Sequence, residues 1–306
     1  MNNEASMTAI KLAVRFLYDI QKLRIAGGNR AHSAFDEEAL DEMEPIEISE
    51  EDQAFIAKVS ESMLTVEHVC ALEVARRLKG NIIYERFLKL QKGCGPRMSG
   101  YLIAETDITK CDTPSQLWRW FGLAVIDGHA ERRVKGEKAH YDPERKAKVV
   151  KVLAESLIKQ RSMPWYDTYA GYKHRKATQM MPVCMACNGT GRYTEKPQNG
   201  KRAAVKSSTE PGVCSNCGGT GGPAPWGRSN AHRHAAAVRF MVKQFLLAFW
   251  REYRLALDLP VRPGYAEEKL GMPPHEINYV TASACASQKA DRQPCTVSEP
   301  EANRQP

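Results

Sequence analysis

Apolar residues recur at three- and four-residue spacing along most of the first 180 positions, and no stretch there alternates steadily between apolar and polar residues. The first pattern is typical of amphipathic helices, whereas alternation is typical of half-buried strands. The chain is therefore predicted to be mainly α-helical.

Two helices are predicted in the N-terminal part. One covers 7–25, where it places Ile10, Val14 and Leu17 on one face, and ends at the Gly-Gly pair at 27–28. The next begins near Ser49, because a serine followed by acidic residues is a typical helix start. Its apolar face is predicted to consist of Ile56, Val59, Met63, Val66, Val69 and Ala71.

Two further helices are predicted beyond these. One covers 82–90. The most regular apolar spacing lies in 229–255, where Ser229 or Asn230 can cap the helix. The apolar face of this helix is predicted to hold Val238, Met241, Phe245, Leu246, Phe249 and Trp250.

Composition favours a soluble chain. Hydrophobic residues make up 42% of the 306 positions, mean hydropathy is -0.48, and no apolar run is long enough to cross a bilayer. The first residues lack the charged, apolar and small-residue segments of a secretory signal. We therefore predict a cytoplasmic protein with no membrane partner, in which thiols stay reduced.

A repeated sequence carries the clearest chemical signal. The segments CMACNGTG at 184–191 and CSNCGGTG at 214–221 both read C-x-x-C-x-G-x-G. Each cysteine pair can direct two thiolates at one ion, and the glycines let backbone amides approach the sulfurs. We predict one structural Zn²⁺ with no open coordination position, bound by Cys184, Cys187, Cys214 and Cys217.

Two alternatives for this region are weaker. Redox chemistry at a C-x-x-C pair would fit a thioredoxin-like βαβ pattern, which does not surround either copy. His232 and His234 follow the second copy closely, but four thiolates already saturate the ion. These histidines are therefore expected on a helix surface or against phosphate.

The two copies at 184–221 resemble the zinc-binding repeats of DnaJ-type co-chaperones, which carry four copies and bind two zinc ions. Two copies imply one ion, and the chain lacks the His-Pro-Asp tripeptide of the J-domain. The resemblance implies a small zinc fold. It also leaves open a module that holds an unfolded or protein partner.

Charge is distributed unevenly around a net value of +8. Residues 35–52 are densely acidic, whereas 127–176 and the segment 192–206 are rich in lysine and arginine. Such separation favours a polyanion partner, although any single charged run is equally typical of a solvated surface.

The stretch FLKLQKGCGPRMSGYLIAE at 87–105 places two glycines between helical segments, which is the layout of a helix-hairpin-helix. In that unit, backbone amides at a helix N-terminus contact a phosphate without reading the bases. A plain αα-corner has the same pattern. The predicted nucleic-acid contacts are Gly93, Gly95, Arg97, Arg132, Arg133, Lys135, Lys138 and Lys146.

Four segments carry a second resemblance: GCGP at 93–96, Ala104-Glu105, the stretch 113–123 and WYDTY at 165–169. Together they resemble the C-terminal domain of the IS-one-ten (Piv-type) transposases and invertases, over about 82–176 and 229–255. The resemblance implies a DNA-binding protein of a mobile element or phage, with the zinc unit as an insertion. It also implies structured RNA as an alternative partner, because these transposases can use a guide RNA.

Two departures from that family bear on catalysis. Its members carry an N-terminal RuvC-like domain with metal-binding carboxylates, and 1–80 is too short and too helical for one. They also use a serine nucleophile, and no serine lies between Gly122 and Lys151. A non-catalytic protein is therefore favoured. The enzymatic alternative is a transposase or recombinase subunit, with candidate groups Asp127, His129, Glu131 and Asp142.

The predicted organisation combines these observations. A helix-hairpin-helix-containing helical domain is interrupted by a small four-cysteine zinc unit with short β-hairpins, and the helix at 7–25 is either a dimerisation arm of a homo-oligomer or a core helix. The predicted segments are 1–35 (helical arm), 36–52 (acidic linker), 53–176 (helical domain), 177–228 (zinc insertion), 229–258 (closing helix) and 259–306 (Pro-rich, disordered tail).

Overall fold

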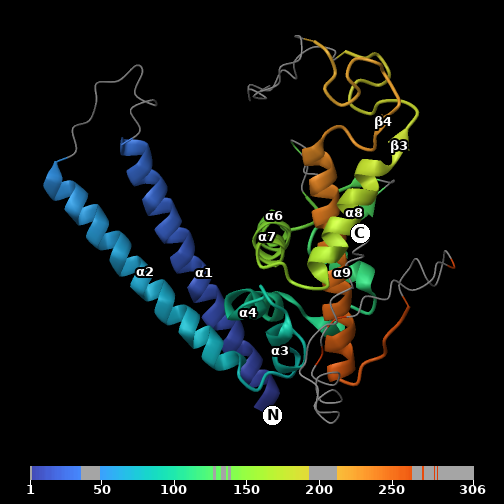
Figure 1. The fold of residues 1–306 in the computed structure, drawn as a ribbon. Coiled ribbons are helices and arrows are strands. Elements are labelled where there is room, and N and C mark those ends of the chain that lie inside the picture. Colours follow the sequence, from blue (N-terminus) through green and yellow to red (C-terminus); the bar gives the residue numbers. More distant parts are fainter. Residues whose placement is uncertain are drawn as a thin grey trace, which may run out of the picture. The chain divides into compact units, whose positions relative to one another are not determined.

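The computed structural model describes residues 2–35, 49–126, 129–131, 136, 139–192, 212–263, 271, 279 and 281. Over these residues the chain is mainly helical, as predicted, with short two-stranded antiparallel sheets (Figure 1). It forms two compact units, one mainly from Met1–Asp112 with Glu252–Pro260 and the other mainly from Thr113–Arg251. The predicted domain 53–176 is therefore divided between both units.

In the first unit, α1 (Asn2–Phe35) and α2 (Glu50–Leu78) form a long helical hairpin (Figure 1). The short helix α4 (Pro96–Glu105) packs against both. Gly100 lies at this contact, where a Cβ atom would come within 2.6 Å of Val74 Cγ1 and 3.1 Å of Val14 Cγ2. Glycine therefore allows the three helices to approach closely. The fully buried residues of the unit include Ile10, Leu17, Val74, Leu78, Ile83, Leu88 and Leu102.

The ends of the two long helices test the sequence predictions. The start of α2 is confirmed, because the Ser49 side chain accepts a hydrogen bond from the Asp52 amide. The predicted end of α1 at Gly27 and Gly28 is wrong, since the helix continues to Phe35. Glycine weakens a helix by about 1 kcal/mol without terminating it, and no neighbouring atom lies close to either glycine.

The predicted apolar face of α2 is only partly covered. Val66 and Val69 are 46% and 59% exposed, and the buried residues of α2 are Glu67, Val74 and Leu78. The reason is that α4 contacts α2 near the C-terminal end of α2, at Val74 and Leu78. The earlier turns of α2 therefore keep one face open.

Glu67 is the polar centre of this unit. Its carboxylate accepts hydrogen bonds from Arg24 of α1 at 2.7 Å and from Arg97 of α4 at 2.6 Å, and its side chain is only 4% exposed. Burial raises the pKa of Glu67, but the hydrogen bond and charge of Arg24, with help from Gln21 and Arg97, outweigh burial and lower the pKa. A charged Glu67 therefore links all three helices.

The predicted third helix is divided into α3 (Ile82–Arg86) and the 3-10 turn η2 (Leu88–Leu90). The chain then turns at Gly93, whose φ is +88°, and α4 begins after Gly95. Two helical segments joined by a tight glycine turn are thus present, as predicted.

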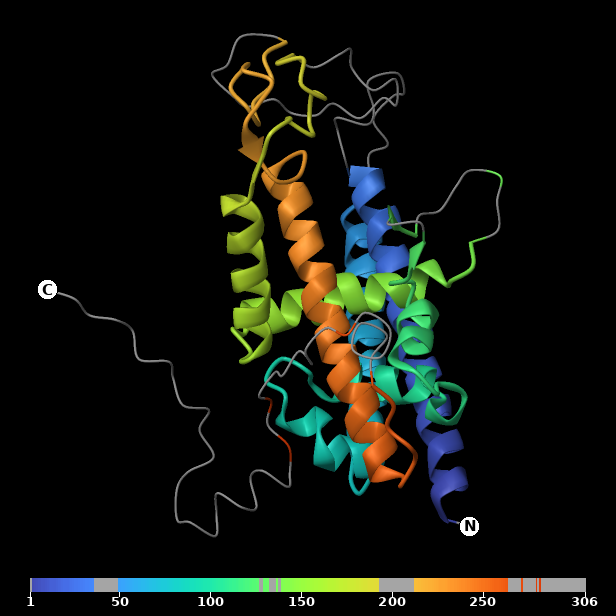
Figure 2. The ribbon, with the colours of Figure 1, turned by 90° about the vertical axis from the view of Figure 1, so that its right-hand side faces the viewer.

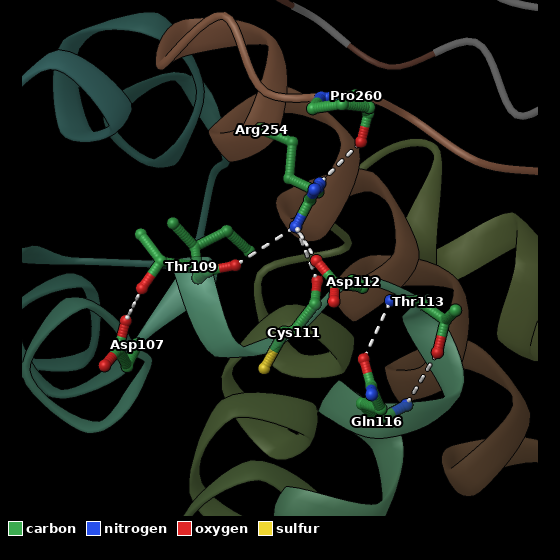
Figure 3. A network of polar contacts seen from close by, with 9 residues as sticks. Asp107, Thr109, Cys111, Asp112, Thr113, Gln116, Arg254 and Pro260 are labelled. Carbon is green, nitrogen blue, oxygen red and sulfur yellow. Dashed lines mark hydrogen bonds and ion pairs between the residues drawn. The ribbon is translucent and has the colours of Figure 1, made fainter.

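A buried arginine closes the first unit after η3 (Ile108–Lys110). Arg254 donates hydrogen bonds to the carbonyl oxygens of Ile108, Cys111 and Pro260 and contacts the Asp112 carboxylate (Figure 3). Arg254 is only 4% exposed. These contacts satisfy carbonyl groups that the short turn leaves without partners.

The second unit begins with α5 (Pro114–Trp120), where Thr113 and Gln116 form a capping box (Figure 3). A small antiparallel pair, β1 (Val125–Ile126) and β2 (His129–Ala130), follows. The next three helical elements follow one another without a break, and a fourth begins after turns at 160–164. They are α6 (Pro143–Ala147), the π-helical turn η4 (Lys148–Leu153), α7 (Ala154–Lys159) and α8 (Trp165–Thr178).

The helix α9 (Asn230–Ala256) supplies much of the core of the second unit. All six residues of its predicted apolar face are buried, and Ser229 caps it by accepting from the His232 amide at 3.1 Å. Trp165 of α8 packs edge-to-face on Phe245, and α8 and α9 lie side by side (Figures 1 and 2).

Among the described residues, no helix combines the length and the apolar character needed to cross a membrane. The predicted linker lies outside the described residues at 36–48, and so does most of the predicted tail.

Candidate metal centre and the cationic surface beside it

The four predicted metal ligands come together on a short excursion between α8 and α9. The strands β3 (Met180–Met181) and β4 (Ala224–Pro225) pair antiparallel and close its stem, and a bridge between Arg192 and Val213 joins the two copies further out. A small unit with short antiparallel pairing was predicted for 177–228 and is found there.

The sulfur positions fit one tetrahedral ion. The Sγ atoms of Cys184 and Cys214 lie 3.8 Å apart, as do those of Cys187 and Cys217, and all four lie within 4.8 Å of one another. Four thiolates at a zinc–sulfur distance of about 2.3 Å from one ion are separated by about 3.8 Å. The cluster therefore fits one metal ion such as Zn²⁺ and leaves no position for water or substrate.

The two turns hold their sulfurs in matching ways. The amide of Gly191 donates to Cys187 Sγ and that of Gly221 to Cys217 Sγ, both at 3.3 Å. The copies also exchange backbone hydrogen bonds, from the Cys184 amide to the Gly221 carbonyl and from the Cys214 amide to the Gly191 carbonyl. The doubled motif thus forms one pseudo-symmetric unit in which each half holds the other.

Glycine is required at two places where the copies cross. Gly191 has φ +74°, and a Cβ atom there would lie 2.1 Å from the Gly219 carbonyl oxygen. Gly221 has φ +78°, and its Cβ atom would lie 2.3 Å from the Gly189 carbonyl oxygen. Neither the backbone conformation nor the space admits a larger residue.

The surroundings of the thiols differ. Burial raises the pKa of Cys184, but hydrogen bonds from the Asn216 side chain and from the amides of Ala186 and Cys187 outweigh burial and lower it to about 6. Burial raises the pKa of Cys214 to about 11. A bound dication would hold both as thiolates, because metal binding displaces thiol protons.

Asn216 connects the metal centre to the neighbouring helix. Its amide nitrogen lies 3.6 Å from Cys184 Sγ and donates to the Gly227 carbonyl at 3.1 Å. Its oxygen accepts from Arg233 of α9, which also donates to the Trp226 carbonyl. The equivalent position of the first copy holds Ala186, so only one half of the unit has this link.

Cations and aromatic rings surround this link. Lys176 of α8 lies over the Trp226 ring at 4.7 Å from its centroid. His232 of α9 stacks on the same ring. Arg175 lies over Tyr172 at 5.1 Å, and Tyr172 stacks on Phe240 at 4.5 Å. We call this region the α8–α9 surface; its charged members are Lys173, Arg175, Lys176, Arg228 and Arg233.

The sequence around the α8–α9 surface is almost free of carboxylates. Residues 168–251 contain thirteen lysines and arginines, and their two acidic residues, Glu195 and Glu210, lie outside the described residues. On α9, burial and the charge of Arg239 lower the pKa of Lys243. Basic residues therefore greatly outnumber acidic ones in this part of the sequence, and nine of the thirteen lie among the described residues.

His232 and His234 are accounted for without a metal. The Nδ1 atom of His232 lies 3.1 Å from the Arg228 amide, and that of His234 lies 2.7 Å from the Tyr169 hydroxyl. Only the four cysteines form a group of potential metal ligands in the described part of the chain. Cys70, Cys94 and Cys111 do not belong to this group.

The structure describes four of the predicted nucleic-acid contacts, three in the first unit and one in the second. Arg97 is paired with Glu67, and Lys146 donates to the Glu131 carbonyl at 2.8 Å. Gly95 is exposed at the start of α4, and Gly93 is half-buried in the preceding turn. Four further predicted contacts, Arg132, Arg133, Lys135 and Lys138, lie outside the described residues.

The candidate catalytic groups that the structure describes belong to no group of potential metal ligands. Asp142 caps α6 by accepting from the Glu144 amide, and Glu131 is buried, with one carboxylate oxygen lacking a hydrogen-bond partner. His129 lies on β2, and Asp127 lies outside the described residues.

No family model, curated protein or solved structure matches the chain. The resemblances to co-chaperone zinc repeats and to transposase C-terminal domains therefore stay predictions.

Proposed function

We propose that the protein is a non-catalytic, zinc-stabilised DNA-binding protein of the kind carried by mobile elements and phages, and that the α8–α9 surface holds the DNA backbone. The observation that carries this proposal is the concentration of cations around the zinc unit in a segment almost without acidic residues. A folded unit tolerates such charge crowding where a polyanion neutralises it.

The contacts of this surface support recognition of backbone phosphates. Arg175 and Arg228 are exposed, and Lys173 and Lys176 lie over aromatic rings that support their long side chains. Cations held in this way suit phosphate contacts, which give affinity and steep salt dependence without reading sequence. The metal ion serves as a fixed anchor, because Asn216 joins its ligand Cys184 to Arg233.

The test is a fluorescence-anisotropy titration of duplex DNA by the zinc-loaded full chain across a salt series. The double variant Arg175→Gln/Arg228→Gln should flatten the slope of log K against log salt by about 2, since each lost phosphate contact removes about 0.9. The matched control is Lys79→Gln/Lys92→Gln, which removes the same charge from exposed positions of the first unit.

Three outcomes would distinguish this proposal from alternative interfaces and ligands. If only the control variant lost DNA affinity and salt dependence, the interface would lie at the glycine turn at 93–95 instead. Tighter binding of structured RNA than of duplex DNA would change the ligand but keep the surface. Absence of binding at low salt by folded protein would overturn the proposal and favour a protein-interaction role for the zinc unit.

A further inference from the structure

The α1–α2 hairpin exposes an unusual amount of apolar surface. Nine large apolar side chains on these two helices are between 46% and 65% exposed. Large exposed apolar side chains that gather on a helix face mark interaction sites. The side chains are Leu12, Phe16, Leu23 and Ile25 on α1, and Phe55, Leu64, Val66, Val69 and Leu72 on α2.

Each helix has one covered and one open apolar face. On α1, Ile10, Val14 and Leu17 are buried, whereas Leu12 and Phe16, one helical turn apart, lie on a separate exposed stripe. On α2, residues 55–66 line one side of an open groove of about 380 Å³, with Ile20 of α1 on the other side. A partner with apolar helices can cover both.

The charges beside these faces are complementary. Over its described side chains, α1 carries Lys11, Arg15 and Lys22, besides the Arg24 that is paired with Glu67, against one acid, Asp19. The first turns of α2 carry Glu50, Glu51, Asp52 and Glu61 against one base, Lys58. The same chain therefore offers both a basic helix and an acidic helix, each with an open apolar face.

We propose that the α1–α2 hairpin is the interface between two copies of this chain. In this arrangement α1 of each copy lies parallel to α2 of the other, which places the basic start of α1 beside the acidic start of α2. A twofold axis repeats the contact, and the two hairpins form a four-helix bundle. A standard interface buries about 800 Å² per partner, and nine half-exposed large apolar side chains can contribute much of such an area.

The test uses charge reversal and light-scattering mass. One variant carries Lys11→Glu with Arg15→Glu, and the other carries Glu51→Lys with Glu61→Lys. None of these four side chains forms an ion pair within the described chain, so the hairpin itself should persist, with circular dichroism as the check. We expect the unmodified protein at twice 34.3 kDa, each variant alone at 34.3 kDa, and their equimolar mixture again at twice 34.3 kDa.

The mixture is the decisive arm, because in the proposed pairing it places an acidic helix against a basic helix at both contacts and so restores the attraction that each variant alone has lost. Unmodified protein that stays at 34.3 kDa over a micromolar concentration series would overturn the proposal and leave the face to a different partner. A dimer that survives Phe16→Ser with Leu23→Ser would also overturn it. DNA binding is measured separately, so failure of either proposal is distinguishable from failure of the other.

Discussion

Substitution of Gly221 by alanine tests whether the two C-x-x-C-x-G-x-G copies form one interlocked unit. The new Cβ atom would lie 2.3 Å from the Gly189 carbonyl oxygen, so the two copies would have to separate by about 1 Å to reach ordinary contact. Movement of Gly221 away from the first copy would break the 2.8 Å hydrogen bond from the Cys184 amide to the Gly221 carbonyl, and the displaced Gly221 amide would lose its 3.3 Å hydrogen bond to Cys217 Sγ.

The size of the effect follows from two contributions. Alanine in a left-handed backbone conformation costs about 1–2 kcal/mol. Loss of a hydrogen bond to a charged thiolate costs about 1.5–3 kcal/mol more. Because about 1.4 kcal/mol corresponds to a factor of ten, Gly221→Ala should weaken zinc binding by several hundred-fold, roughly.

The assay is competition for zinc between the full chain and a chromophoric chelator, with Gly218→Ala as the matched control. Gly218 also has a positive φ, +63°, but no atom lies within 4 Å of its Cβ position. This control should weaken binding only about tenfold, because it has the backbone cost alone. If Gly221→Ala and Gly218→Ala lost zinc affinity by the same factor, the close approach of the two copies would be refuted.

Three further predictions concern the metal centre and the helices of the first unit. Asn216→Ala should weaken zinc binding about 10-fold or more by the same competition assay, because it removes the hydrogen bond to Cys184 Sγ. Glu67→Gln should lower the free energy of unfolding by about 3 kcal/mol in urea at neutral pH. The pKa of Glu67 in the folded protein lies below its ordinary 4.5. The stability that the Glu67 carboxylate contributes is therefore fully present above pH 4.5 and is lost as the pH falls through the folded-state pKa, where the variant and the unmodified protein become alike. Gly27→Ala should stabilise the chain by about 0.5–1 kcal/mol, whereas Gly100→Ala should destabilise it by about 1–3 kcal/mol through its contacts with Val74 and Val14, both read from urea midpoints.

Sequence periodicity predicted the parts of the fold in which local pattern and burial agree. The apolar face of α9 and the start of α2 at Ser49 are examples, because each depends on residues within a few turns of one another. The end of α1 was missed, since two glycines in a helix that contacts its neighbour elsewhere are tolerated. The open face of α2 was missed because sequence shows apolar spacing but not what covers it.

The metal centre was predictable for a different reason. Its four ligands lie within two short repeats, so spacing alone identifies them, and the structure brings their sulfur atoms together. The α8–α9 surface was not predictable in the same way, because Lys176 meets Trp226 only after the zinc stem has joined distant segments. A search for long stretches with few acidic and many basic residues would have drawn attention to 168–251 from the sequence.

Neutralisation of the metal centre does not account for the charge around it. A dication bound by four thiolates has a net charge of −2, and nearby cations stabilise it. The segment 168–251, however, has thirteen basic and two acidic residues, a net charge of +11 against +8 for the whole chain. Subtracting the centre still leaves about +9 in this segment, which favours an external polyanion over an internal role. If the cations served only the metal, Arg175→Gln with Arg228→Gln would weaken zinc binding and leave the salt dependence of DNA binding unchanged. We expect the opposite result.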